Sequence, residues 1–223
     1  APASPEAGEA VAKALVAGLG VGDRWLPDAA TSAAAAHAEP FLKALAAIKT
    51  EGEPSAALLT VVGRVAEHHA RGGPVDSIGG VLSAFVDSSA SPFGRAVAQQ
   101  VVLGEAKGWP ADKRPTLDAA TEKALAGLLE RLPAEGRGRL VALGSRWGSS
   151  AMKEASEGVV RNLLTQVDDE KLSDRGRADA AREAVAMRPD DDAVAADLVG
   201  RLSPRTSPAL ASGLIEALAE GRA

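Results

Sequence analysis

The histidines are the first residues to examine for chemistry, because the chain contains only three and two of them are adjacent. His68 and His69 follow Glu67 in a segment with helical periodicity. Adjacent helical residues point about 100° apart, whereas a helix-borne metal site needs i, i+4 spacing. His68 and His69 are therefore weak candidates for a metal or acid–base site. The favoured interpretation is a pair of cations near a helix C-terminus that ends in Gly72-Gly73.

Two other segments contain residue types that could bind phosphate or act as nucleophiles. The run Gly18 to Gly22 is glycine-rich, but no strand precedes it and the GxGxxG pattern is incomplete. Ser145, Ser149 and Ser150 have no GxSxG context and no histidine close in sequence. The sequence therefore predicts no catalytic residue and no cofactor-binding residue.

Arginine and tryptophan residues are the candidates for protein contacts. Arg137 and Arg139 alternate with glycine and could bind a phosphate or a carboxylate, or could lie on a solvated helix start. Trp109 precedes a proline in a polar loop, so it either closes the core over that loop or is exposed and marks a contact surface. We select Trp109, Arg137 and Arg139 as candidate interaction residues. Trp25 is expected to pack under a helix corner, and Trp147 on an apolar stripe.

The composition limits the class of protein. Of the 223 residues, 46% are hydrophobic but only 3% are aromatic, which favours close packing of Ala, Leu and Val helices over a β-sandwich. A net charge of −5 without a basic stripe argues against nucleic-acid binding, and no apolar run reaches a membrane-spanning length. The absence of cysteine excludes disulfides, thiolate zinc sites and a CxxCH haem attachment in this segment. The start at Ala1, without methionine, suggests a processed protein or an excised piece.

Caps and apolar faces predict an all-α chain of about eleven or twelve helices. The organising pair runs from Asp23 to His37 and from Glu39 to Lys49, and Asp23 is expected to be the first cap. Other helices are expected over 4–19, 116–132, 137–147, 151–167, 174–187, 191–202 and 207–219, and from starts at Ser55, Pro74 and Ser91. Apolar helix pairs joined by corners need neighbours on both sides, which predicts an α-solenoid of antiparallel helices.

The longest polar loop divides this prediction into two parts. Residues 108–115 are rich in Pro, Lys and Asp and are the expected boundary. Helical repeats are then expected over 1–107 and over 116–223.

The order of several motifs resembles a known family. Asp23-Arg24-Trp25-Leu26 is followed by the alanine-rich run to His37-Ala38 and by Phe41-Leu42, and then by helices over 58–66 and 78–85. This order resembles the HEAT-like helical region of large exported proteins from planctomycetes and related bacteria. The resemblance covers most of the chain and is best over 22–108. In that family a β-propeller module similar to sugar or sorbosone dehydrogenases precedes the repeats, and a c-type cytochrome domain often follows.

The resemblance implies a function without chemistry in this segment. It implies a HEAT-like solenoid that acts as a non-catalytic scaffold, linking a dehydrogenase-like domain to a cytochrome c domain in an extracytoplasmic (periplasmic) redox protein. The expected partners are protein domains or subunits, and c-type haem would lie elsewhere in the parent. No propeller or CxxCH is present here, so no redox residue carries over. The alternatives are a subunit of an electron-transfer dehydrogenase assembly and a small helical enzyme with an unrecognised site.

Overall fold

The computed structural model describes residues 3–188 and 191–221, and it confirms the predicted all-α class. Twelve α-helices and no β-strand lie in these residues. The chain forms two compact units. The first unit ends at Met152 and the second begins at Lys153, so the division falls within one helix, α9 (Ser150–Asp168). None of the helices in the described ranges has the length and apolarity needed to cross a membrane.

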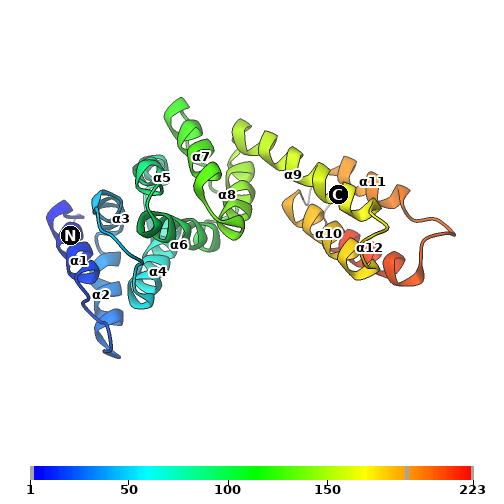
Figure 1. The fold of residues 1–223 in the computed structure, drawn as a ribbon. Helices are drawn as coiled ribbons and strands as arrows, with labels where there is room; N and C mark the ends of the chain where they lie inside the picture. Colours follow the sequence, from blue (N-terminus) through cyan, green and yellow to red (C-terminus); the bar gives the residue numbers. More distant parts are fainter. Residues whose placement is uncertain (1–2, 189–190, 222–223) are drawn as a thin grey trace. The chain divides into compact units, whose positions relative to one another are not determined.

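The first unit is built from eight helices and the start of α9. They are α1 (Pro5–Val16), α2 (Leu26–Ala35), α3 (Ala38–Ala47), α4 (Ala56–Gly72), α5 (Ser77–Ser88), α6 (Pro92–Gly108), α7 (Ala119–Arg131) and α8 (Ala134–Trp147). The odd-numbered helices pack in series, α1 on α3, α3 on α5 and α5 on α7, and the even-numbered helices α2, α4, α6 and α8 do the same (Figure 1). The two rows also contact each other, as in the pairs α1 with α2, α3 with α4, α5 with α6 and α7 with α8, and they enclose the apolar core of this unit.

Serine caps fix several helix starts where the sequence predicts them. The hydroxyls of Ser4, Ser55 and Ser91 accept hydrogen bonds from backbone N–H groups three residues later, at 3.0 to 3.2 Å. Asp23 behaves differently: its carboxylate accepts from the N–H groups of Trp25 and Leu26, and α2 begins only at Leu26. The helix expected to open at Pro74 likewise begins at Ser77.

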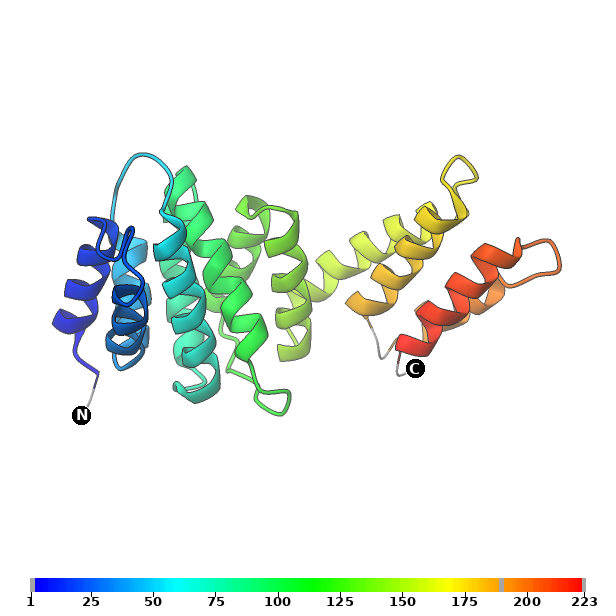
Figure 2. The same ribbon diagram turned by 90° about the horizontal axis from the view of Figure 1, so that it is seen from below.

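Small residues allow α4 and α6 to approach closely. A Cβ atom on Gly104 would lie 2.4 Å from the carbonyl oxygen of Gly63, and one on Gly108 would lie 2.4 Å from that of Glu67. Glycine at these two positions is therefore what permits the close contact of the two backbones (Figure 2).

The chain does not divide at the expected boundary of 108–115. The helix before this loop, α6, packs on α8, which follows the loop and α7, and the Arg146 guanidinium of α8 donates to the carbonyl oxygen of Trp109 at 3.3 Å. These contacts keep the loop within the first unit.

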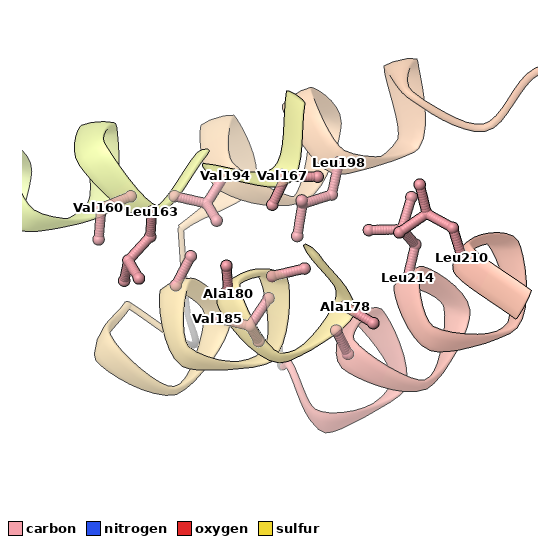
Figure 3. Packing of buried hydrophobic residues seen from close by; sticks show 13 residues of the cluster. Val160, Leu163, Val167, Ala178, Ala180, Val185, Val194, Leu198, Leu210 and Leu214 are labelled. Carbon is pink, nitrogen blue, oxygen red and sulfur yellow. The ribbon is translucent and has the colours of Figure 1, made fainter. Parts of the chain in front are cut away.

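The second unit has its own core. Its helices α10 (Asp174–Met187), α11 (Asp192–Gly200) and α12 (Pro208–Glu220) pack together with the C-terminal part of α9. Figure 3 shows Val160, Leu163 and Leu198 among the apolar side chains that gather around the alanines of α10. A Cβ on Gly213 would lie 2.4 Å from that of Ala178, so small side chains again set the spacing of two helices.

Candidate functional site

A buried chain of polar side chains links three helices of the first unit. His69 of α4 has its Nδ1 atom 2.7 Å from Oε1 of Glu105 on α6. Its Nε2 atom lies 2.8 Å from Oγ of Ser77, the first residue of α5. His69 is 3% exposed and Glu105 is fully buried, whereas Ser77 is half-buried. The order serine, histidine, carboxylate is that of a hydrolytic triad, so its proton positions decide what it can do.

The apolar stripes of two neighbouring helices place this pair in the core. His69 continues the buried face that Val62 and Val65 form on α4, and Glu105 continues the face of Val97 and Val101 on α6. Because α4 packs on α6, the imidazole and the carboxyl group meet inside the protein.

A glycine after α4 completes the fit of the imidazole ring. A Cβ atom on Gly73 would lie 2.6 Å from the carbonyl oxygen of His69 and 2.9 Å from Cδ2 of its ring. Only a residue without a side chain leaves room for the ring in this position.

The carboxyl group of Glu105 is in an unfavourable place for a charge. Burial raises its pKa, against the opposing effects of the hydrogen bond and the charge of His69. Its second oxygen, Oε2, is buried and has no hydrogen-bond partner. Burial removes water from the carboxyl group, and this costs more free energy for a charged carboxylate than for a neutral carboxylic acid. The lack of a hydrogen-bond partner at Oε2 agrees with this direction of the pKa change.

The hydroxyl of Ser77 limits the chemistry of the chain. It lies 2.6 Å from the carbonyl oxygen of Pro74, which can only accept, so the single hydroxyl proton is donated there. His69 Nε2 must then carry a proton and donate it to Ser77 Oγ. An imidazole protonated at Nε2 cannot accept the proton of the hydroxyl, so this arrangement ties helices together and does not activate a nucleophile.

The sequence interpretation found His69 but missed its two partners. His68 is exposed and points away from the buried His69, and no group of three or more possible metal ligands occurs in the part of the chain described here. Glu105 could have been found as the carboxylate that continues the i, i+4 stripe of Phe93, Val97 and Val101. Ser77 carries no comparable signal, because only the tertiary contact of α4 with the start of α5 brings it to the imidazole.

Two of the three remaining serine candidates make structural hydrogen bonds. Ser149 Oγ donates to the carboxylate of Glu122 at 2.7 Å and accepts from the N–H of Met152, so it caps α9. Ser150 binds the same carboxylate through its backbone N–H. Ser145 lies in the last turn of α8, and its buried hydroxyl has no hydrogen-bond partner.

Trp109 follows the core interpretation, and Trp25 lies opposite to expectation. Trp109 is 6% exposed, its ring packs edge-on against Trp147 at 4.7 Å between centroids, and its Nε1–H donates to the carbonyl oxygen of Lys113. The core interpretation therefore describes Trp109, and its side chain forms no contact surface. Trp25, which was expected to be packed, is 69% exposed. Arg137 and Arg139 are both exposed, in the first turns of α8.

An exposed apolar surface surrounds Trp25, and we call it the α1–α2 tip. It comprises Leu19, Val21, Trp25 and Leu26, which are 39%, 62%, 69% and 41% exposed. Three glycines with positive φ, Gly18, Gly20 and Gly22, give the connection its shape. The Arg24 guanidinium lies 4.9 Å from the centre of the Trp25 ring, so the exposed indole carries a cation on one face.

Comparisons with protein-family models, with curated proteins and with solved structures give no significant match to this chain.

Proposed function

We propose that this chain is a non-catalytic module of HEAT-like helical repeats, an α-solenoid of antiparallel helices that binds another protein through the α1–α2 tip. The absence of an activated nucleophile at Ser77 agrees with a role in binding.

Several contacts at recurring sequence separations support the repeat architecture. In the first unit, Arg64 pairs with Asp28, His69 with Glu105, and Gln99 with Glu135, and the partners of each pair are 36 residues apart. In the second unit, Arg201 pairs with Asp168 and Ser207 with Asp174, each 33 residues apart. Recurring separations of this size are what stacked helix pairs of similar length would give.

The exposed α1–α2 tip is the single observation that carries the binding function. Four large apolar side chains within eight residues are left in contact with water, and one of them is a tryptophan beside an arginine. Tryptophan and arginine are the residues most enriched where binding energy concentrates in protein interfaces. The partner expected is a protein with an apolar recess that accepts the indole.

Site-specific crosslinking tests this proposal. A photoreactive residue placed at Trp25, and separately at the exposed Ile215 of α12 as a matched control, would be activated in an extract of the native source. We expect a protein that is captured from position 25 alone. With that protein purified, Trp25→Ser should weaken binding at least about tenfold in calorimetry, and Ile215→Ser should not. Equal binding by both variants, or capture only by lipid vesicles, would contradict the proposal.

The family resemblance extends this proposal to a parent redox protein in an extracytoplasmic compartment. There the module would hold a dehydrogenase-like domain and a cytochrome c domain in a fixed relation. Intact mass and visible absorption of the protein from its native source test this extension. A mass well above 22.6 kDa with a c-type haem band supports it, and a colourless protein of about that mass contradicts it.

A further inference from the structure

His37 holds the first turn of α1 in place. The N–H of Ser4, the cap residue of α1, donates to Nδ1 of His37 at 2.9 Å. His37 is itself the residue before α3, so this hydrogen bond joins the N-terminal ends of two helices that lie side by side (Figure 1). A flipped ring would place a carbon atom at this position, and carbon cannot accept the bond, so the orientation of the imidazole is determined.

The two helices are packed closely around this hydrogen bond. A Cβ atom on Gly8 would lie 2.7 Å from the backbone nitrogen of Phe41 and 2.9 Å from the Cβ atom of Pro40, so the first turns of α1 and α3 are in direct contact. Ser4 is also held from its own helix, because its Oγ accepts from the N–H of Ala7 at 3.2 Å. His37 and the serine cap therefore fix the start of α1 together.

The hydrogen bond requires a neutral imidazole. Nδ1 accepts the Ser4 N–H through its lone pair, so the ring carries its single proton on Nε2. A second proton would bind that lone pair and place two N–H groups against each other. His37 also lies at the N-terminal ends of α1 and α3, where the helix dipole is positive and disfavours a cation. A protonated His37 and the hydrogen bond to Ser4 therefore exclude each other.

None of the carboxylates in residues 3–188 forms an ion pair with His37. The charged and titratable groups on the elements around it are Glu6 and Glu9 on α1, Glu39 on α3, Glu67, His68 and Arg71 at the end of α4, and Asp76 before α5, and the end of α2 has none. The Glu6 carboxylate accepts from Ser4 Oγ at 2.8 Å, and that of Asp76 accepts from the N–H of Thr116 at 2.7 Å. The other carboxylates each pair with a lysine or an arginine, and His68 is exposed.

From this geometry we propose that His37 is an acid-sensitive latch on α1. When the ring takes up a second proton, its hydrogen bond to Ser4 breaks and the first turn of α1 separates from α3. Histidine is the side chain that ordinarily changes its charge between about pH 5 and about pH 8, so the latch responds to mild acid. The inference is independent of the proposed function, because the α1–α2 tip follows the other end of α1.

Hydrogen–deuterium exchange of the full chain tests the latch. We measure amide protection over 9–16 in α1 and correct it for the intrinsic effect of pH on exchange. This protection should fall at least about fivefold from about pH 7.5 to about pH 5.5, because one hydrogen bond is lost. Protection in α12 is the internal reference and should not change, because the second unit contains no histidine.

Two substitutions of His37 separate the latch from other effects of acid. His37→Asn places an amide oxygen near the position of Nδ1 and accepts at every pH, so α1 should stay protected at the lower pH. His37→Ala should lose the protection at both pH values. His68→Asn, at the exposed neighbouring histidine of α4, is the matched control and should keep the native pH dependence.

The nitrogen-15 chemical shifts of the His37 ring provide a second measurement, which does not depend on a variant. They should show the proton on Nε2 at neutral pH, and the titration of the ring should have the same midpoint as the loss of α1 protection. A proton on Nδ1, an α1 that stays protected once the ring is protonated, or a loss with a different midpoint would overturn the proposal. Equal acid sensitivity of the native chain and His37→Asn would overturn it as well, because another group would then be responsible.

Discussion

Two loops of the first unit each contain a tryptophan, and the structure buries one and exposes the other. Trp109 begins the connection between α6 and α7, and Trp25 ends the connection between α1 and α2. The exposed fractions are 6% and 69%. The connection that ends at Trp25 is rich in glycine, and the one that begins at Trp109 is polar and contains prolines, but neither pattern says which ring is buried.

Distant contacts account for the difference. The N–H of Trp109 extends the hydrogen bonding of α6 through the carbonyl oxygen of Glu105, and its ring meets Trp147 from α8. Its indole N–H also has a partner, Lys113, so the ring can be buried without an unmet donor. The Trp25 ring has the guanidinium of its neighbour Arg24 on one face and is mostly open to water. The comparison teaches that burial of a loop tryptophan depends on a partner helix, here one that follows much later in the chain.

Trp109→Ala should have the largest effect on this comparison. It removes a buried indole and leaves a cavity beside Trp147, so we expect the free energy of unfolding to fall by about 3–5 kcal/mol. Trp25→Ala should change it by less than about 0.5 kcal/mol. All three tryptophans lie in the first unit, so fluorescence during urea unfolding reports on that unit in both variants. Similar losses in the two variants would show that the loops do not differ as described.

Gly104→Ala should have the next largest effect. The added Cβ would lie 2.4 Å from the carbonyl oxygen of Gly63 and 2.7 Å from the Cβ of Ala66, so α4 and α6 must move apart. We expect a loss of about 1–3 kcal/mol in urea unfolding. Gly138→Ala is the control, because it lies within α8 with no other atom within 4 Å of the added Cβ. That substitution should stabilise the protein by about 0.5–1 kcal/mol, and a loss there would indicate a general effect of substituting glycine.

The helices and most of their caps could be predicted from the sequence because their causes are local. Ser4, Ser55 and Ser91 cap helices at the predicted positions, and the apolar stripe from Ile78 to Phe85 is buried as expected. The start of α2 could not be fixed as well, because Asp23 caps from outside the helix through the N–H groups that follow it.

The candidate site was less predictable because its partners come from separate helices. Periodicity places His69 and Glu105 on apolar faces, but it does not say that these faces meet. The contact with Ser77 depends further on the path of the chain through Gly73 and Pro74. The division of the chain after Met152 is also a property of tertiary contacts, because it falls inside the continuous helix α9.

Glu105→Gln should change how stability depends on pH. The folded pKa of Glu105 lies above its ordinary value of 4.5, so the folded protein holds this proton more tightly than the unfolded chain. The associated stability is fully present below pH 4.5 and is lost as the pH rises through the folded pKa, at up to about 1.4 kcal/mol per pH unit. Glutamine cannot ionise, so the variant should lack this loss.

Urea unfolding from pH 4.5 upward measures this difference. The stability of the variant relative to the native chain should rise with pH over the window in which Glu105 ionises. Glu130→Gln, at an exposed position of α7, is the control and should give a flat difference. A flat difference for Glu105→Gln as well would show that its pKa is not raised in the folded protein.

Arg24→Gln should give the smallest effect and the finest test of the two loops. An exposed cation–π contact contributes about 0.5–1 kcal/mol at most, and the Trp25 ring is open to water, so we expect a loss of about 0.5 kcal/mol or less. Single-tryptophan variants, with phenylalanine at the other two positions, separate the signals of Trp25 and Trp109. Arg24→Gln should change the emission and the acrylamide quenching of Trp25 only. Arg114→Gln, an exposed arginine of the other loop, should change neither tryptophan, because the Trp109 ring is shielded by Trp147. If Trp109 were quenched as readily as Trp25, the contrast between a buried and an exposed loop tryptophan would be wrong.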